Sequence, residues 1–220
     1  AAEERAMNTT GRAGKLRLER RLLTAQHGAE LLDRKQRILA DELERLHLRA
    51  ARTEQAWLTA ARDAESWLAR TAALDGRELI AAAAPVIPAE VQLEWGGAMG
   101  VTYPEDARCE APVAAPAGAS SALTYAMSAA RAALDAGVRQ AAAQRAVLLV
   151  AAELKATRTR LRAVQKRWIP RLENELNTIR RQLQEQELQE NLRLRWSADA
   201  IVRSAAAERA SSPGGTAVPR

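Results

Sequence analysis

The chain has 220 residues, of which 50 are alanine and none is phenylalanine, and 27% of them are charged. This composition is typical of long helices and argues against an ordinary compact domain. Lysine and arginine outnumber aspartate and glutamate by 33 to 27, so the formal net charge is +6. Such an excess is compatible with a nucleic acid or an acidic protein as partner, but it identifies neither.

The sequence predicts neither a membrane span nor a secretory signal. Its longest apolar runs fall well short of the roughly 20 residues that cross a bilayer. The first residues include Glu3, Glu4 and Arg5 and have no apolar segment behind them. A single cysteine, Cys109, cannot form an internal disulfide, which fits a reducing compartment. We therefore expect a cytoplasmic protein that does not span the membrane.

A seven-residue apolar repeat runs from Leu18 to Trp67. Alternate steps of four and three residues meet fifteen positions, thirteen of which are apolar, while charged residues fill most positions between them. No proline interrupts residues 1–84, and Asp75-Gly76 is a typical helix end. We predict a flexible segment at residues 1–11 and a first long helix at residues 12–74.

Residues 75–120 are rich in proline and glycine and are predicted to form a hairpin and loop region. Val91, Leu93 and Trp95 alternate with polar residues, and the segment 101–103 follows the glycine-rich stretch 96–100. This pattern predicts a β-hairpin with a five-residue loop. We expect residues 110–118 to be an irregular linker.

A second periodic block covers residues 121–208, preceded by the helix-capping residues Ser120 and Ser121. Its apolar spacing is less regular, with an eleven-residue insertion between Leu161 and Leu172. Pro170 lacks a backbone donor, so we expect one helix with a kink or local opening near residues 167–169. Residues 209–220 are predicted to be a disordered tail.

The simplest fold for two long helices with a turn-rich insertion between them is antiparallel packing of their apolar seams. We therefore predict a mostly α fold, a long antiparallel two-helix coiled coil with a small β-hairpin and loop insertion. Alanine at seam positions allows the helix axes to approach closely. Trp57 and Trp67 fit the seam as core residues. Trp168 most simply fills the core beside the kink, with a partner anchor as the less favoured alternative.

Three segments resemble the D subunit of V-type ATPases and archaeal-type ATP synthases. Residues 11–32 are similar to the amino-terminal helix of that family, although Thr10-Gly11-Arg12 departs from its common Pro-Thr-Arg entry. Ile169-Pro170-Arg171-Leu172-Glu173 matches the signature of the carboxy-terminal helix, and Met99-Gly100-Val101 with Pro104 resembles the hairpin segment.

The resemblance implies a non-catalytic central-stalk rotor. Its joined termini would project into a hexameric ring of catalytic A-type and regulatory B-type subunits. Its hairpin-bearing part would join a small F-type subunit and a socket subunit above the membrane ring. Torque would couple ATP hydrolysis or synthesis to H⁺ or Na⁺ movement, without a nucleotide or cofactor bound to this chain. The sequence selects neither the ion nor the direction.

The residues themselves offer no catalytic or metal constellation. Gly11–Leu16 lacks the spacer and the hydroxyl residue of a phosphate-binding loop. His27 and His47 are twenty residues apart on one predicted helix, too far to share a metal ion. Cys109 is interpreted as a free loop thiol. We therefore expect no cofactor, no metal and no enzymatic activity of the chain alone.

Clustered basic residues are the candidate ring contacts. The second helix carries a basic band with no acidic residue from Lys155 to Leu172. An antiparallel arrangement would bring the start of the first helix beside Arg193, Arg195 and Arg203, forming a basic tip. The band comprises Lys155, Arg158, Arg160, Arg162, Lys166, Arg167 and Arg171, and the start of the first helix contributes Arg12, Lys15, Arg17, Arg20 and Arg21.

We hypothesise that these residues face acidic loops of the ring through contacts of about 1 kcal/mol or less each. The alternative is that they only keep the surface soluble. Gly96, Gly97, Met99 and Gly100 are candidate hairpin contacts, or simply a permissive loop.

Two other classes of function remain as alternatives, a basic helical hairpin that binds nucleic acid and a structural scaffold or export chaperone. Nucleic-acid binding needs stacking platforms or a groove-reading helix, and neither is visible in the sequence. Bound nucleic acid at high salt would favour the first alternative, whereas co-assembly with a hexameric ATPase ring would favour the rotor.

Overall fold

The computed structural model describes residues 11–85, 87–112 and 120–211. By its internal contacts the described chain divides into a central unit, residues 30–162, and a terminal unit made of residues 11–29 and 163–211. The two units are described in turn. The predicted flexible segment 1–11, linker 110–118 and tail 209–220 fall mostly outside the described residues.

Helix α2 (Gly11–Asp75) contributes to both units and follows the predicted heptad seam. Of the fifteen seam positions, Leu18, Leu39 and Leu46 are almost completely buried and only Trp57 is exposed, at 38%, so the expectation that Trp57 is a core residue is wrong. The helix ends at Asp75, because Gly76 takes a positive φ of 81°, a conformation that glycine adopts without strain.

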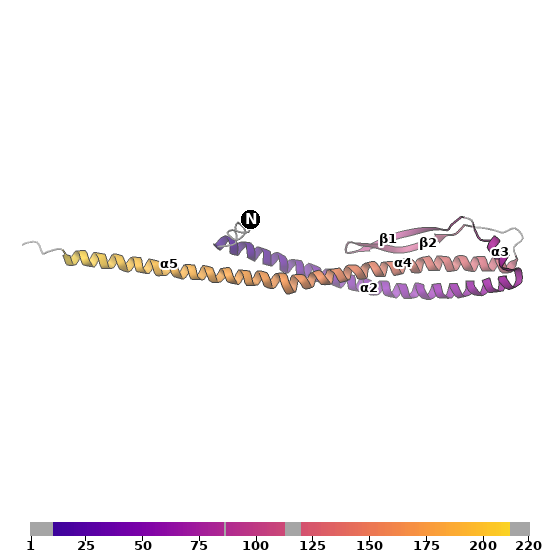
Figure 1. Ribbon diagram of the computed structural model, residues 1–220, viewed down its shortest axis with the longest axis horizontal. Helices are drawn as coiled ribbons and strands as arrows, with labels where there is room; N and C mark the ends of the chain where they lie inside the picture. Colours follow the sequence, from indigo (N-terminus) through magenta and orange to yellow (C-terminus); the bar gives the residue numbers. More distant parts are fainter. Residues whose placement is uncertain (1–10, 86, 113–119, 212–220) are drawn as a thin grey trace, which may run out of the picture. The chain divides into compact units, whose positions relative to one another are not determined.

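In the central unit α2 packs antiparallel against α4 (Ser121–Ala163), as Figure 1 shows. Lys35 forms an ion pair with Glu153 at 2.8 Å, and Trp67 stacks on Tyr125 with ring centroids 4.9 Å apart. At the end of the pair the Ser120 hydroxyl donates to the Asp75 carboxylate and accepts the Leu123 N–H at 3.1 Å, so it caps α4. These contacts join residues far apart in sequence and fix the antiparallel direction.

The core of the central unit combines leucines of α2 with alanine, valine and leucine of α4. Leu39 and Leu46 pack with Ala146, Val150 and Leu154, all buried. Seven-residue spacing on α2 supplies the large side chains, and alanine on α4 leaves room for them. Trp57 extends over Gly137, which has no side chain to block the indole. The seam therefore closes by large-on-small packing.

The insertion contains α3 (Arg77–Ala82), which the sequence analysis did not predict, and a hairpin of β1 (Glu90–Ala98) and β2 (Val101–Glu110). The predicted five-residue loop is wrong. Met99 and Gly100 alone form the turn, with φ of 50° and 84°, so the strands extend through Gly96 and Gly97. Two successive positive φ angles are the geometry of a tight two-residue hairpin turn.

In the terminal unit the first residues of α2 pack antiparallel against α5 (Ile169–Ser211). Leu18 is buried with Leu172, Leu176 and Ile179. Two ion pairs flank this cluster, Glu19 with Arg180 at 3.1 Å and Arg12 with Glu187 at 3.4 Å. The pairing thus continues along α5 as far as Glu187.

Helices α4 and α5 are joined by a π-helix, η1 (Val164–Trp168), just before Pro170. The Ile169 N–H donates to the Val164 carbonyl, the five-residue spacing of a π turn. Because proline cannot continue the regular hydrogen-bond ladder, a wider turn just before it leaves fewer backbone groups without partners. The wider turn directs Trp168 outward, so the expectation that it fills the core is wrong: it is 47% exposed.

Within residues 11–85, 87–112 and 120–211, none of the helices combines the length and apolar character required to cross a bilayer.

Candidate partner-contact surfaces

The end of α5 presents large apolar side chains to solvent. Beyond Glu187, the last residue in an ion pair with α2, six such side chains are between 49% and 68% exposed. Leu188, Leu192 and Trp196 recur every four residues, and the step of five after Leu183 takes them off the face that packs on α2. We call this set the tip surface; it consists of Leu188, Leu192, Leu194, Trp196, Ile201 and Val202. Exposed apolar area of this extent on one helix marks a site of protein contact.

The basic residues at the start of α2 do not lie beside Arg193, Arg195 and Arg203. The Arg12–Glu187 and Arg180–Glu19 ion pairs set the register. They place the start of α2 beside residues 180–187 of α5, which carry charges of both signs. In an antiparallel pair, later residues of α5 lie beside earlier residues of α2. Arg193 and Arg195 come after Glu187, the partner of Arg12, so they lie beyond the part of α2 that the structure describes. The single basic tip expected from the sequence is therefore divided into two parts.

All seven residues of the basic band are exposed. Lys155, Arg158, Arg160 and Arg162 lie on α4 in the central unit. Lys166 and Arg167 lie on η1 in the terminal unit, and Arg171 forms an ion pair with Glu175 at 2.9 Å. Trp168, next to Arg167 in sequence, has the Arg21 guanidinium over its ring at 5.7 Å. Its exposure suits a partner contact better than the core role that the sequence favoured.

A polar cluster fixes the hairpin to α2. The hydroxyl of Tyr103, a residue only 3% exposed, donates to Glu42 Oε1, and Arg45 binds both Glu42 oxygens at 2.6 and 3.0 Å. The Arg45 guanidinium lowers the pKa of Glu42, with a further contribution from the Tyr103 hydroxyl. Burial, followed by the Glu42 carboxylate, raises the pKa of Tyr103. The cluster is therefore a neutral phenol bound to an ionised pair.

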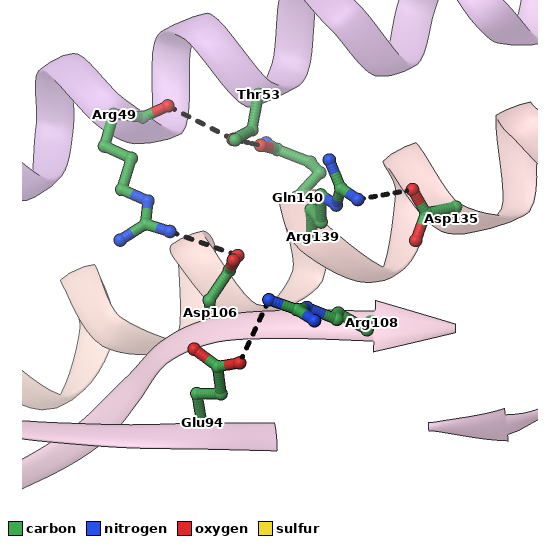
Figure 2. A network of polar contacts seen from close by, with 8 residues as sticks. All are labelled: Arg49, Thr53, Glu94, Asp106, Arg108, Asp135, Arg139 and Gln140. Atoms are coloured by element: carbon green, nitrogen blue, oxygen red, sulfur yellow. Dashed lines mark hydrogen bonds and ion pairs between the residues drawn. The ribbon is translucent and has the colours of Figure 1, made fainter. Parts of the chain in front are cut away.

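Further contacts hold β2 to both helices, as Figure 2 shows in part. Arg49 of α2 reaches Asp106 at 3.2 Å. The backbone N–H of Cys109 donates to Asp135 of α4, which also binds Arg139 at 2.9 Å. Cys109 is a free, half-buried strand residue rather than a loop thiol. The hairpin is thus attached along β2.

The four hairpin contact candidates separate into two groups. Met99 and Gly100 form the turn, where Met99 is exposed. Gly96 and Gly97 lie within β1, and both positions are spatially restricted. A Cβ on Gly96 would lie 2.5 Å from a Glu105 carboxylate oxygen, and one on Gly97 would lie 3.0 Å from the Val101 carbonyl. The backbone contact favours glycine at position 97, whereas at position 96 the Glu105 side chain would have to move.

An apolar hollow that the sequence analysis missed lies between α3, α4 and the segment before β1. Its volume is about 390 Å³. The side chains that line it are mostly apolar, and they include Leu68, Ile80, Ile87, Leu123, Met127 and Leu134. Arg131, at its edge, donates to the Pro112 carbonyl at 3.2 Å. No sequence signal marks it, because its lining comes from four separate segments.

Among the described residues, no group of three or more histidine, cysteine, aspartate or glutamate side chains is placed to hold a metal ion.

Comparison with known proteins identifies relatives over most of the chain. A family model described as the D subunit of ATP synthase matches residues 15–199. The chain is 29% identical over 201 residues to the D subunit of the V-type ATP synthase of Thermus thermophilus, covering 86% of this chain and 84% of the relative. The protein of the same name from a second strain of this species matches to the same extent.

Proposed function

Since the chain belongs to the family of ATP synthase D subunits, it is a stalk subunit of a rotary V-type ATPase, and we propose that it acts there as the central rotor shaft. It transmits torque between ATP hydrolysis or synthesis in a hexameric head of A- and B-type subunits and ion movement through a membrane ring. The ion is H⁺ or Na⁺. The chain supplies no catalytic group and works at the cytoplasmic face as a peripheral component of a membrane complex.

The tip surface is the observation that carries this proposal. Burying each of its six large apolar side chains in a partner contributes on the order of 1 kcal/mol or more, which is enough together to hold a helix end inside a ring. No described residue of the chain covers it. Apolar contacts between the helix end and the ring also permit rotation, because the hydrophobic effect is not directional.

The exposed arginines and lysines add a second contact of the type a turning shaft needs. Ion pairs between exposed side chains contribute about 1 kcal/mol or less and are screened by salt, so they bias angular positions without creating deep traps. We place the basic band against acidic loops of the ring. The hairpin-bearing central unit takes the small F-type subunit and the socket subunit above the membrane ring.

Rotation of a marked chain in an immobilised head tests the proposal directly. A cysteine introduced at exposed Gln55 of α2, in a Cys109→Ser background, carries a bead. We expect stepwise rotation on addition of ATP. A bead that stays fixed while the head hydrolyses ATP at its normal rate would contradict the rotor role.

A matched pair of variants tests the tip surface. Leu192→Glu with Trp196→Glu introduces charge at two exposed tip positions, and Leu48→Glu with Leu148→Glu does so at two exposed positions of the central unit. We expect the tip variant to fold normally but to lose most ATP-driven rotation, and the central-unit variant to keep it. Equal effects of the two variants on rotation would show that the tip surface has no special part in holding the chain in the ring.

A further inference from the structure

Strand β1 has a free edge. It pairs with β2 on one side only, in a sheet that has two strands within the described residues. Every residue from Glu90 to Trp95 is exposed. Leu93 pairs with the buried Ala107 and Val91 with Cys109, and paired residues share a face, so Val91 and Leu93 lie on the helix side of the sheet but remain about half exposed. The outer N–H and C=O groups of β1 are therefore available to pair with another strand.

The two faces of β1 differ in chemistry. Val91, Leu93 and Trp95 share one face and are 47%, 43% and 62% exposed. Glu90, Gln92 and Glu94 share the other face. A regular alternation of this kind normally places the apolar face against a core. Here it lies on the same side as the buried Ala107 of β2, but the helices leave it 43–62% exposed, which is apolar area that an added strand can cover.

The strand is held in a fixed position by its neighbour. β2 buries Tyr103 and Ala107 against the helices, and Asp106 reaches Arg49 of α2. Arg108 of β2 forms an ion pair with Glu94 of β1 at 3.4 Å, as drawn in Figure 2. The free edge is thus presented on a hairpin that is already ordered, so a partner strand loses little free energy in ordering it.

The charge of the hairpin selects the kind of partner. Residues 90–110 contain five acidic residues and one arginine, a net charge of −4 in a chain whose total is +6. Glu90 and Glu94 on the polar face of β1 disfavour pairing with a second copy of the same strand, since like charges would lie opposite each other. They favour lysine or arginine on an incoming strand.

We propose that β1 accepts an extended segment of a partner protein as a third strand of the hairpin sheet. The side chains of this segment alternate between apolar residues, which lie beside Val91, Leu93 and Trp95, and lysine or arginine residues, which lie beside Glu90 and Glu94. Backbone hydrogen bonds supply the attachment and the alternating side chains supply the selectivity. The inference rests on the proposed function only in that the partner is sought within the rotary complex.

Amide hydrogen exchange of residues 90–98 tests the proposal, measured in the isolated chain and in the assembled complex. We expect exchange in β1 to slow by about ten-fold or more on assembly, because edge amides become protected when they are hydrogen-bonded. Leu93→Lys should remove most of this protection, since it adds positive charge and removes an apolar contact. Leu148→Lys, an equally drastic change at an exposed position of α4, should retain it.

The other occupants give different results. A helix lying on the apolar face would leave the exchange of the edge amides unchanged, although Leu93→Lys would weaken assembly, and this result would overturn strand addition. If the amides of β1 in the isolated chain became more protected as the protein concentration rose, the occupant would be a second copy of the chain. This result would also overturn the proposal of a partner strand. If the complex assembles and the amide exchange of β1 is unchanged, the third strand is rejected and the rotor role stands. If the wild-type chain fails to assemble with the complex, both proposals are overturned.

Discussion

The Tyr103 hydroxyl donates a hydrogen bond to Glu42, joining the hairpin to α2 across 61 residues of sequence. Both groups are largely withdrawn from water, and Arg45 binds the same carboxylate. A buried hydrogen bond to an ionised acceptor contributes more than a neutral one, and it also holds two segments in register. This contact therefore couples the order of the hairpin to the folding of the helical pair.

Replacing Tyr103 by phenylalanine tests this coupling. The ring still fills its site, while Glu42 loses one of its donors. We expect Tyr103→Phe to lower the free energy of unfolding by about 1.5 kcal/mol, as measured by urea denaturation. Tyr125→Phe is the matched control, since Tyr125 is exposed and stacks on Trp67 through its ring. A loss no larger for Tyr103→Phe than for the control would show that the hydroxyl does not secure the hairpin.

The Glu42 cluster also predicts a dependence of stability on pH. Arg45 and Tyr103 lower the folded-state pKa of Glu42 below its ordinary value of 4.5. A carboxylate with a lowered folded-state pKa stabilises the fold above that ordinary value, and the contribution is lost as the pH falls through the folded-state pKa.

We therefore expect the difference in unfolding free energy between the wild-type chain and Glu42→Gln to be constant from neutral pH to about pH 5 and to shrink below about pH 4.5. Denaturation curves at a series of pH values measure it. Glu44→Gln, at an exposed neighbouring position, controls for the loss of a negative charge. A difference that grows on acidification would contradict the assignment of the ionised form.

Gly28 of α2 and Gly137 of α4 should respond oppositely to alanine. A Cβ at Gly28 meets nothing within 4 Å, so Gly28→Ala should raise the unfolding free energy by about 0.5–1 kcal/mol through helix propensity. A Cβ at Gly137 would lie 3.1 Å from Trp57 Nε1, so Gly137→Ala must displace the indole and should lose that gain. Thermal unfolding followed by circular dichroism compares them. In a Trp57→Ala background the two alanine substitutions should become equally favourable; a persistent difference would point to another cause.

The long helices could be predicted from the sequence because their core is a periodic pattern. A seam residue recurs every third or fourth position along α2, and a single seven-residue period predicts the seam from Leu18 onward. The hairpin strands were predicted for a similar reason, since alternation has a period of two. Gly76 ends α2 and Ser120 caps the start of α4. Both act through local backbone geometry, so the residue type alone indicates the helix boundary.

The features that escaped prediction depend on contacts between distant segments or on unusual backbone angles. Met99 adopts a positive φ although it is not glycine, so the short turn left no sequence signal. Trp168 was assigned to the core from its spacing, but the π-helix changes which residues face α2. The Tyr103–Glu42 contact requires the docked position of the hairpin. The extent of the tip surface depends on the register of α2 on α5, which the ion pair of Arg12 with Glu187 defines.

Charge reversal in the basic band tests the electrostatic part of the proposed rotor role. Arg158→Glu with Arg162→Glu reverses two exposed charges of the band on α4, and Arg52→Glu with Arg145→Glu reverses two exposed charges elsewhere in the central unit. Both variants have the same net charge. We expect only the band variant to weaken the coupling of ATP hydrolysis to rotation, with a few-fold loss that is largest at low ionic strength. Salt screens contacts between exposed charges, so the difference should nearly vanish near 1 M salt. Rotation and ATPase rates measured together over a salt series decide the question. Unchanged coupling in the band variant at every salt concentration would leave these arginines as solubilising residues only.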